Sequence, residues 1–297
     1  MDVDGNAKNM DMKLLTSAHE GSHAASPIER VRWIDYPIAT ETLLHLQRMM
    51  DHPPSHRPPC SLIVGDTNNG KTMIARQFAK RHNAGTSNSA TISEYPVVYV
   101  QSPPGPSLNM LCSSLLRSVH APAQTGAPWS RSLYQVTDLF PRLNVKMIII
   151  DEIHNLLQGT NANQEVFLNG LRYLTNELRI PVVAVGVKRV ERVFQTDQQL
   201  GNRFKTWSIS RWDPDQNYAL FLNRIIRSSG HTPSDTWKEA QPVQKIHVKC
   251  EGLTGETVDL MNKIIRYAKE AGHQVVDPAF IGNVDWVKPD SRRANAR

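Results

Sequence analysis

One stretch constrains the fold more than any other: residues 61–72, S-L-I-V-G-D-T-N-N-G-K-T. A short apolar strand leads into the pattern G-x-x-x-x-G-K-T, and apolar residues at helical spacing follow it. Gly65 and Gly70 permit the positive φ angles that bring backbone N–H groups close to a phosphate chain, beside the positive end of the following helix. Lys71 can reach the β- and γ-phosphates, and the Thr72 hydroxyl can coordinate Mg²⁺. A glycine-rich turn that contains Lys-Thr by chance is the alternative, which the flanking strand and helix disfavour. The expected nucleotide contacts are Gly65, Asp66, Thr67, Asn68, Asn69, Gly70, Lys71, Thr72 and Met73.

A second apolar run, residues 145–150, ends in the acidic pair Asp151-Glu152. This pattern is typical of a buried parallel strand whose charged end lies at the carboxyl edge of the sheet, where such folds bind ligands. We expect Asp151 to hold Mg²⁺ through its water shell, and Glu152 to orient and deprotonate an attacking water. A helix-capping pair is the alternative. Together with the phosphate loop, the pair predicts an Mg²⁺-dependent ATPase.

Two aromatic residues, Trp33 and Tyr36, precede the phosphate loop in the sequence. Segments in this place often flank the adenine ring, so both are candidate base-pocket residues. Core packing against the amphipathic helix expected at residues 39–50 is an equally good interpretation.

Composition limits the other possibilities. Three scattered cysteines without metal-ligand spacing predict a reducing compartment and no disulfide framework. No apolar run approaches a membrane span and no N-terminal h-region is present, so we expect a soluble, cytoplasmic protein without a membrane partner. A net charge of +6 is compatible with a nucleic-acid partner without proving one.

Periodicity predicts a parallel, doubly wound sheet of five strands, because strands alternate with helices up to about residue 212. The expected strands are 61–64, 96–101, 145–150, 180–186 and 206–209, and one of the helices between them covers 187–200. Beyond residue 213 only helices are expected, at 215–228, 237–250 and 254–271.

These changes of pattern divide the chain into five expected segments. They are a flexible N-terminal arm (1–27), a helical linker (28–59), an ATPase core (60–212), a helical lid (213–271) and a basic C-terminal tail (272–297). An α/β core followed by a small helical lid is the layout of the AAA+ P-loop ATPases.

Over residues 27–270 the sequence resembles TniB, the AAA+ ATP-binding protein of transposons related to mercury-resistance elements. TniB is similar to TnsC, MuB and IstB, ATPases that assemble on target DNA and bring in the transposase. The resemblance rests on the segments 32–37, 65–74, 149–157, 167–178 and 180–183.

The resemblance implies further roles and two departures. Arg203 stands where AAA+ proteins keep an arginine finger, which would complete the catalytic set with Lys71 and Glu152, although a surface arginine at a helix end is the alternative. The fourth strand ends at Gly186 where the family pattern has a polar residue. The lid has no arginine near residues 255–258, and only Lys263 or Arg266 could replace it. Both departures predict slow hydrolysis.

Related ATPases line a DNA channel with basic residues from the helices after the second and fourth strands. The matching candidates here are Arg117, Lys188, Arg189 and Arg192. Such contacts would be made mostly to phosphates and would be sensitive to salt. Solvated surface cations are the alternative for each of them.

The sequence as a whole favours an ATP-dependent regulator of transposition. It would form a homo-oligomer, a ring or helical filament, on duplex target DNA and recruit a DDE-type transposase, with a TniQ-type target-selection protein as a further partner. Two other functions stay open: a helicase-loader-type AAA+ ATPase, and a nucleotide-controlled interaction switch that does not bind DNA.

Overall fold

The computed structural model describes residues 33–53, 55–84, 94–123 and 128–294. By its internal contacts the chain divides into two units, residues 1–33 and residues 34–297, and all described residues except Trp33 belong to the second. The expected N-terminal arm lies outside the described residues. The expected boundaries after residues 59, 212 and 271 fall inside the second unit and stay predictions.

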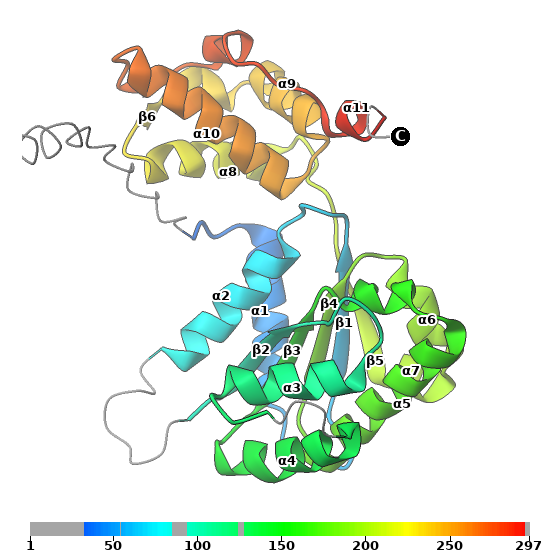
Figure 1. The fold of residues 1–297 in the computed structure, drawn as a ribbon. Helices are drawn as coiled ribbons and strands as arrows, with labels where there is room; N and C mark the ends of the chain where they lie inside the picture. The colour runs from blue at the N-terminus through cyan, green and yellow to red at the C-terminus, as the bar shows by residue number, and fades with distance from the viewer. Residues whose placement is uncertain (1–32, 54, 85–93, 124–127, 295–297) are drawn as a thin grey trace, which may run out of the picture. The chain divides into compact units, whose positions relative to one another are not determined.

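A five-stranded parallel sheet forms the centre of the second unit (Figure 1), which confirms the predicted fold class. Its spatial order is β2-β3-β4-β1-β5, and each neighbouring pair is parallel. The strands are β1 (Cys60–Gly65), β2 (Val97–Gln101), β3 (Met147–Asp151), β4 (Val182–Gly186) and β5 (Phe204–Ile209).

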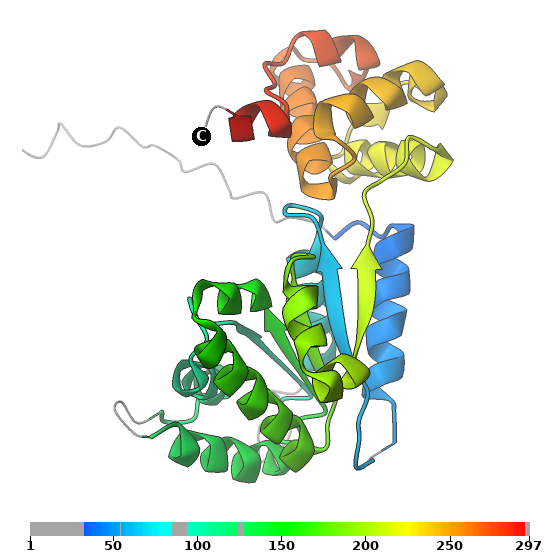
Figure 2. The same cartoon turned by 90° about the vertical axis from the view of Figure 1, so that its right-hand side faces the viewer.

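Helices cover both faces of this sheet (Figures 1 and 2). On one face, His45 lies 3.1 Å from Ser61 of β1, and Trp207 of β5 donates a hydrogen bond to Thr42. The helices of that face are α1 (Pro37–Met50) and α2 (Lys71–Asn83). The helices of the other face include α3 (Leu108–Ser118), α4 (Trp129–Arg142) and α5 (Asn161–Leu178).

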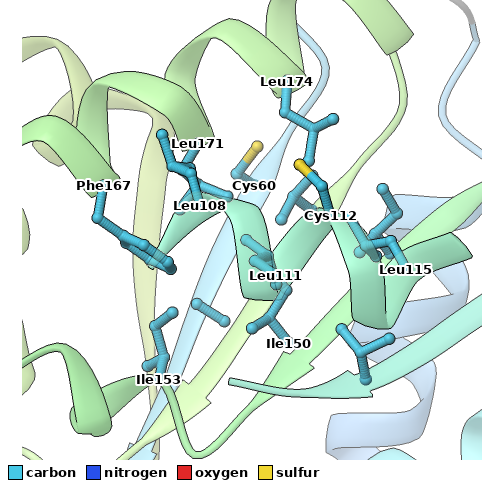
Figure 3. Packing of buried hydrophobic residues seen from close by; sticks show 14 of the residues in the cluster. Cys60, Leu108, Leu111, Cys112, Leu115, Ile150, Ile153, Phe167, Leu171 and Leu174 are labelled. Atoms are coloured by element: carbon cyan, nitrogen blue, oxygen red, sulfur yellow. The ribbon is translucent and has the colours of Figure 1, made fainter. Parts of the chain in front are cut away.

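One large cluster of the core lies between the sheet and the helices of this second face (Figure 3). Ile148 and Ile150 of β3 belong to this cluster, whereas Met147 and Ile149 alternate with them and are buried on the opposite face. Because both faces are covered, the strand has no polar positions until Asp151, which explains its continuous apolar run. Phe167 brings the largest side chain of α5 into the cluster.

Local polar side chains determine where several helices begin. Ser107, Thr160 and Asp215 each accept a hydrogen bond from a backbone N–H of the first turn that follows, in α3, in α5 and in α8 (Gln216–Ser228). The prediction of one helix over 187–200 was wrong, and a capping residue explains why. Asp197 has extended backbone angles and caps a second helix, which divides the segment into α6 (Val190–Thr196) and α7 (Gln198–Arg203).

After the sheet, the chain continues mainly through helices, as predicted. The helix expected at 237–250 is instead a 3₁₀ turn, η2 (Asp235–Lys238), followed by α9 (Ala240–Cys250) and then by α10 (Thr254–Glu270). The tail is structured as far as residue 294, where only a basic tail was expected. Its elements are β7 (Val275–Val276), which pairs with β6 (Thr232–Pro233), then η3 (Pro278–Gly282) and α11 (Pro289–Ala294).

Phe167→Ala should lower the free energy of unfolding by about 3–5 kcal/mol, because the fully buried ring would leave a cavity that the surrounding core fills only in part. Val166→Ala is the matched control, since Val166 is the neighbouring residue and is 56% exposed. Equilibrium unfolding in urea measures both variants. Equal destabilisation by the two would contradict this assignment of the core.

Candidate nucleotide-binding site

The parallel register brings the carboxyl ends of the strands to one edge of the sheet. Gly65 pairs with Ile209, Val64 with Gly186, and Gln101 with Asp151. The phosphate loop after β1 and the acidic pair after β3 therefore meet at the same edge, as the sequence predicts.

The phosphate loop has the backbone conformation of an anion site. Asn68 and Gly70 have φ angles of 62° and 84°, and α2 begins at Lys71 without a capping side chain among the described residues. The first N–H groups of this helix are thus left for a ligand. Lys71 Nζ donates to the carbonyl oxygens of Gly65 (3.0 Å) and Asp66 (2.6 Å). Burial lowers the pKa of Lys71, and the nearby carboxylates act in the opposite direction.

Asp151 is almost completely buried and is held by two donors. The Tyr99 hydroxyl donates to its Oδ2 at 2.7 Å, and the Glu152 N–H donates to its Oδ1 at 2.8 Å. Arg76 Nε donates to the Tyr99 oxygen at 3.2 Å. Burial and the Asp151 carboxylate raise the pKa of Tyr99, which keeps its hydroxyl protonated as a donor. The sequence prediction missed Tyr99 and Arg76, because only strand pairing places Tyr99 beside β3 and only the packing of α2 beside β2 brings Arg76 to Tyr99.

Glu152 adopts a left-handed backbone conformation, with φ of 55°, between β3 and the 3₁₀ turn η1 (Ile153–Gln158). Its Oε2 lies 3.2 Å from His154 Nε2. The last residue of β4, Gly186, carries no polar side chain. A Cβ atom at Gly186 would lie 2.9 Å from Ile153 Cγ2, so η1 occupies the space of a side chain there.

The residues at this edge fit Mg²⁺ with a nucleotide. Thr72 lies on the first turn of α2, and the Asp151 carboxylate faces the same edge, so the available ligands are hard oxygen atoms. The described residues contain no group of three or more His, Cys, Asp or Glu side chains that could enclose a metal. A Mg²⁺ ion bound by Thr72 and Asp151 would keep most of its waters and take further ligands from phosphates.

A buried amide ties the phosphate loop to the lid. Asn69 Nδ2 donates to the carbonyls of Ile209 and Ser210, while its Oδ1 accepts from the N–H and hydroxyl of Thr254 at the start of α10. The Gly255 N–H donates to the Asn68 carbonyl. The Asn69 side chain is thus occupied within the protein, which leaves its backbone to contact a ligand.

Tyr36 is buried beside Trp212 and Phe221, and a contact between Tyr36 and a base stays a prediction. The residue is 5% exposed, and the centre of its ring lies 5.4 Å from that of Trp212 and 5.2 Å from that of Phe221. Burial raises its pKa to about 12, and a Cβ atom at Gly70 would lie 2.7 Å from its hydroxyl oxygen. Trp33 is half-buried in the other unit, and a contact between Trp33 and a base stays a prediction.

A cavity of about 550 Å³ opens beside the loop. Arg211 Nε lies 2.6 Å from Asp66 Oδ2 across one wall. The two lid cations proposed from the sequence are not among the residues that line it: Lys263 donates to the Asp285 carbonyl, and Arg266 is exposed. The lining residues are Asp66, Thr67, Asn68, Arg211, Glu256, Pro289, Arg292 and Arg293. The sequence prediction missed the last five, which lie 139 or more positions after Thr72 and reach the loop only through the fold.

Arg203 ends α7 directly before β5, at the amino edge of the sheet, away from the phosphate loop of its own chain. Its Nη1 donates to the Thr175 hydroxyl at 2.9 Å. A contact between Arg203 and the nucleotide of a second copy stays a prediction.

The four candidate DNA contacts do not form one group. Lys188, Arg189 and Arg192 are exposed and follow β4 at the carboxyl edge. Arg117 is exposed near the end of α3, three residues before His120, whose ring lies 6.3 Å from the ring of Tyr95 at the amino edge. The structure thus separates Arg117 from the other three.

Arg211→Gln should raise the pKa of Asp66, because the hydrogen bond from Arg211 is the largest cause of its lowered pKa. The rise should be partial, since Lys188 and Lys71 also act on Asp66. A carboxyl group with a lowered folded-state pKa contributes stability above its unfolded value of about 3.9, and this contribution is lost as the pH falls through the folded-state value. The variant should therefore lose less stability than wild type when the pH is lowered below about 4.

Carboxyl-carbon NMR titration measures the Asp66 pKa directly. Arg227→Gln, an exposed arginine on α8, is the control and should leave the value unchanged. An unchanged Asp66 pKa in Arg211→Gln would contradict the assignment.

Among the described residues, no helix has the length and apolar character needed to cross a bilayer.

No curated protein matches the sequence of this chain. Several solved structures share its fold at low sequence identity. The ORC2 protein of Aeropyrum pernix, in ADPNP-ADP complexes, is 18% identical with a TM-score of 0.58, and the match covers 83% of this chain and 65% of that one. This chain thus spans slightly less than two thirds of that protein.

Two other structures agree with this fold. The ORC1 protein of Aeropyrum pernix in complex with DNA is 16% identical with a TM-score of 0.60, covering 86% of this chain and 66% of that one. Domain III of the Thermotoga maritima replication initiation protein DnaA is 12% identical with a TM-score of 0.53, and the match covers 84% of this chain and 91% of that one.

Residues 25–214 match the family described as bacterial TniB protein. The phosphate loop, the acidic pair after β3 and the strand order all lie within this match, and the chain belongs to the TniB family, with the fold of the AAA+ ATPases.

Proposed function

We propose that this chain binds ATP with Mg²⁺, hydrolyses it slowly and, in its ATP form, assembles on duplex target DNA to bring in a DDE-type transposase. The observation that carries the nucleotide part is the meeting of Lys71 with Asp151 and Glu152 at one edge of the sheet. Membership in the TniB family supports the part that concerns transposition.

In the proposed bound state, Lys71 exchanges the carbonyls of Gly65 and Asp66 for oxygens of the β- and γ-phosphates. The N–H groups of the loop and of the first turn of α2 contact the same phosphates. Thr72 and Asp151 would hold the Mg²⁺, which would neutralise part of the phosphate charge.

Glu152 acts as the base in the proposed reaction. Its carboxylate takes a proton from the water whose oxygen bonds to the γ-phosphorus. The bond to the bridging oxygen breaks, and its electron pair stays on ADP. Glu152 Oε2 is paired with His154 Nε2 at 3.2 Å, so this oxygen must leave His154 before it can act as the base. This pairing, and the lack of a polar side chain at Gly186, both favour slow turnover.

Assembly on DNA would place cations against phosphates. Lys188, Arg189 and Arg192 are exposed on adjoining turns and could follow a backbone together. The ORC1 structure is of a protein of this fold in complex with DNA, which supports the class of partner. Arg203 would complete the site of a neighbouring copy and make hydrolysis depend on assembly.

A TniQ-type protein is a further proposed partner, and the three free, buried cysteines favour the reducing cytoplasm. Co-purification with a replicative helicase instead of a transposase would favour the helicase-loader function. Nucleotide binding without any DNA binding would favour the interaction switch.

Lys71→Gln should abolish nucleotide binding, because the phosphates lose their buried counter-charge. Glu152→Gln should bind ATP like wild type and hydrolyse it about 10² to 10⁴ times more slowly, as expected for loss of a general base. Calorimetry and phosphate release measure the two effects. Lys80→Gln, an exposed lysine on the same helix, is the control. Hydrolysis at the wild-type rate by Glu152→Gln would remove Glu152 from the mechanism.

Replacement of Lys188, Arg189 and Arg192 by Gln should weaken binding to random duplex DNA in the presence of ATP. The slope of log affinity against log salt should fall in magnitude by about 0.9 for each phosphate that the variant no longer neutralises. The control triple variant, Arg227→Gln, Lys245→Gln and Lys269→Gln, removes the same charge from exposed positions elsewhere. Fluorescence anisotropy over a salt series compares them, and equal weakening by both would reject a local contact surface.

A further inference from the structure

The C-terminal segment beyond the lid reaches the phosphate loop. Trp286 Nε1 donates to the Lys249 carbonyl, and the Asp290 N–H donates to Glu251 Oε1, which fastens the start of α11 to the end of α9. Pro289 is buried. With α11 held in this way, Arg292 and Arg293 line the same cavity as the loop residues 66–68.

Glu256 links this segment to the loop. The side chain is almost buried, its Oε1 accepts from Asn68 Nδ2 at 3.0 Å, and its Oε2 is paired with Arg292 Nη2. A carboxylate this deeply buried needs a partner charge, and Arg292 supplies it. Arg292 is therefore one side chain away from the phosphate loop.

The lid itself offers no cation at this place. The first two turns of α10, residues 254–262, carry the acids Glu256 and Asp259 and no lysine or arginine. Lys263, one position further, is directed to the Asp285 carbonyl and lies over the Trp286 ring. Positive charge in the cavity thus comes from Arg211 after β5 and from α11.

Of the two arginines on α11, Arg292 is the one linked to the phosphate loop, through Glu256, and its guanidinium also lies 5.6 Å from the centre of the Trp286 ring. Arg211 is engaged by Asp66 and by the Glu251 carbonyl, and Arg293 by Asp290. Arg292 is half-exposed, and its hydrogen bond to Glu256 uses Nη2, which leaves other donors of the planar guanidinium to face the cavity.

We infer that Arg292 is a ligand of the terminal phosphate of ATP, supplied by the C-terminal segment and held by Glu256 until the nucleotide binds. The inference rests on the proposed nucleotide site. A guanidinium can donate two parallel hydrogen bonds to a phosphate, which together are at least as strong as one hydrogen bond to a single carboxylate oxygen. The γ-phosphate therefore competes with Glu256 for Arg292. ADP lacks this group, and the segment therefore distinguishes the triphosphate from the diphosphate.

The two partners of the pair should give opposite results. Arg292→Gln removes the phosphate ligand and should weaken binding of a slowly hydrolysed ATP analogue about tenfold or more, while ADP binding changes less than about threefold. Glu256→Gln removes the competitor, keeps an acceptor for Asn68, and should strengthen binding of the analogue. Arg292→Lys, which keeps the charge without the fork, should lie between Arg292→Gln and wild type.

Calorimetry on the full-length chain with Mg²⁺ and either the analogue or ADP measures these affinities, with Arg266→Gln, an exposed lid arginine, as the control. Equal weakening of both nucleotides by Arg292→Gln and Glu256→Gln would mean that the pair only supports the fold, and would overturn the inference. An unchanged analogue affinity in Arg292→Gln would also overturn it while leaving the nucleotide site intact. If wild type binds neither nucleotide, the proposed function fails as well.

Discussion

The parallel pairing of β1 with β4 and β5, and of β3 with β2 and β4, is the constraint on which the site depends. In such a sheet all strands point the same way, so Gly65 and Asp151 must lie at the same edge although more than 80 residues separate them. Helices on both faces make this register stable, because a slip of one residue would exchange the two buried faces. The chemistry is therefore positioned by the backbone of the sheet before any side chain contributes.

Charge is balanced closely around the phosphate loop. Lys71, Arg211 and Arg292 each bond to oxygen atoms of the protein itself, from the loop carbonyls, Asp66 and Glu256. In the proposed bound state, each of these cations exchanges a contact within the protein for a contact to phosphate. Nucleotide binding on this view is a change of partners, and it couples the loop to the lid and to the C-terminal segment.

Two departures from the AAA+ pattern have structural counterparts. β4 ends at Gly186 and η1 packs against this residue, so a polar side chain there would collide with Ile153. The lid helix lacks an early arginine, and α11 brings Arg292 and Arg293 to the cavity instead. A residue can thus be absent from its usual place in the sequence while its charge is provided from another element.

The sequence by itself determined the fold class, the phosphate loop and the acidic pair, because each is written in a short contiguous pattern of residues that local physics interprets directly. It also predicted all five strands of the sheet, but not the division of 187–200, where the single capping residue Asp197 outweighed helical periodicity. Only the tertiary structure decided that Tyr99 holds Asp151, that Asn69 ties the loop to α10, and that Arg292 reaches Asn68 through Glu256. These contacts join residues that are 36 to 188 positions apart in the chain. No local pattern encodes which distant side chains are brought together when helices pack on a sheet.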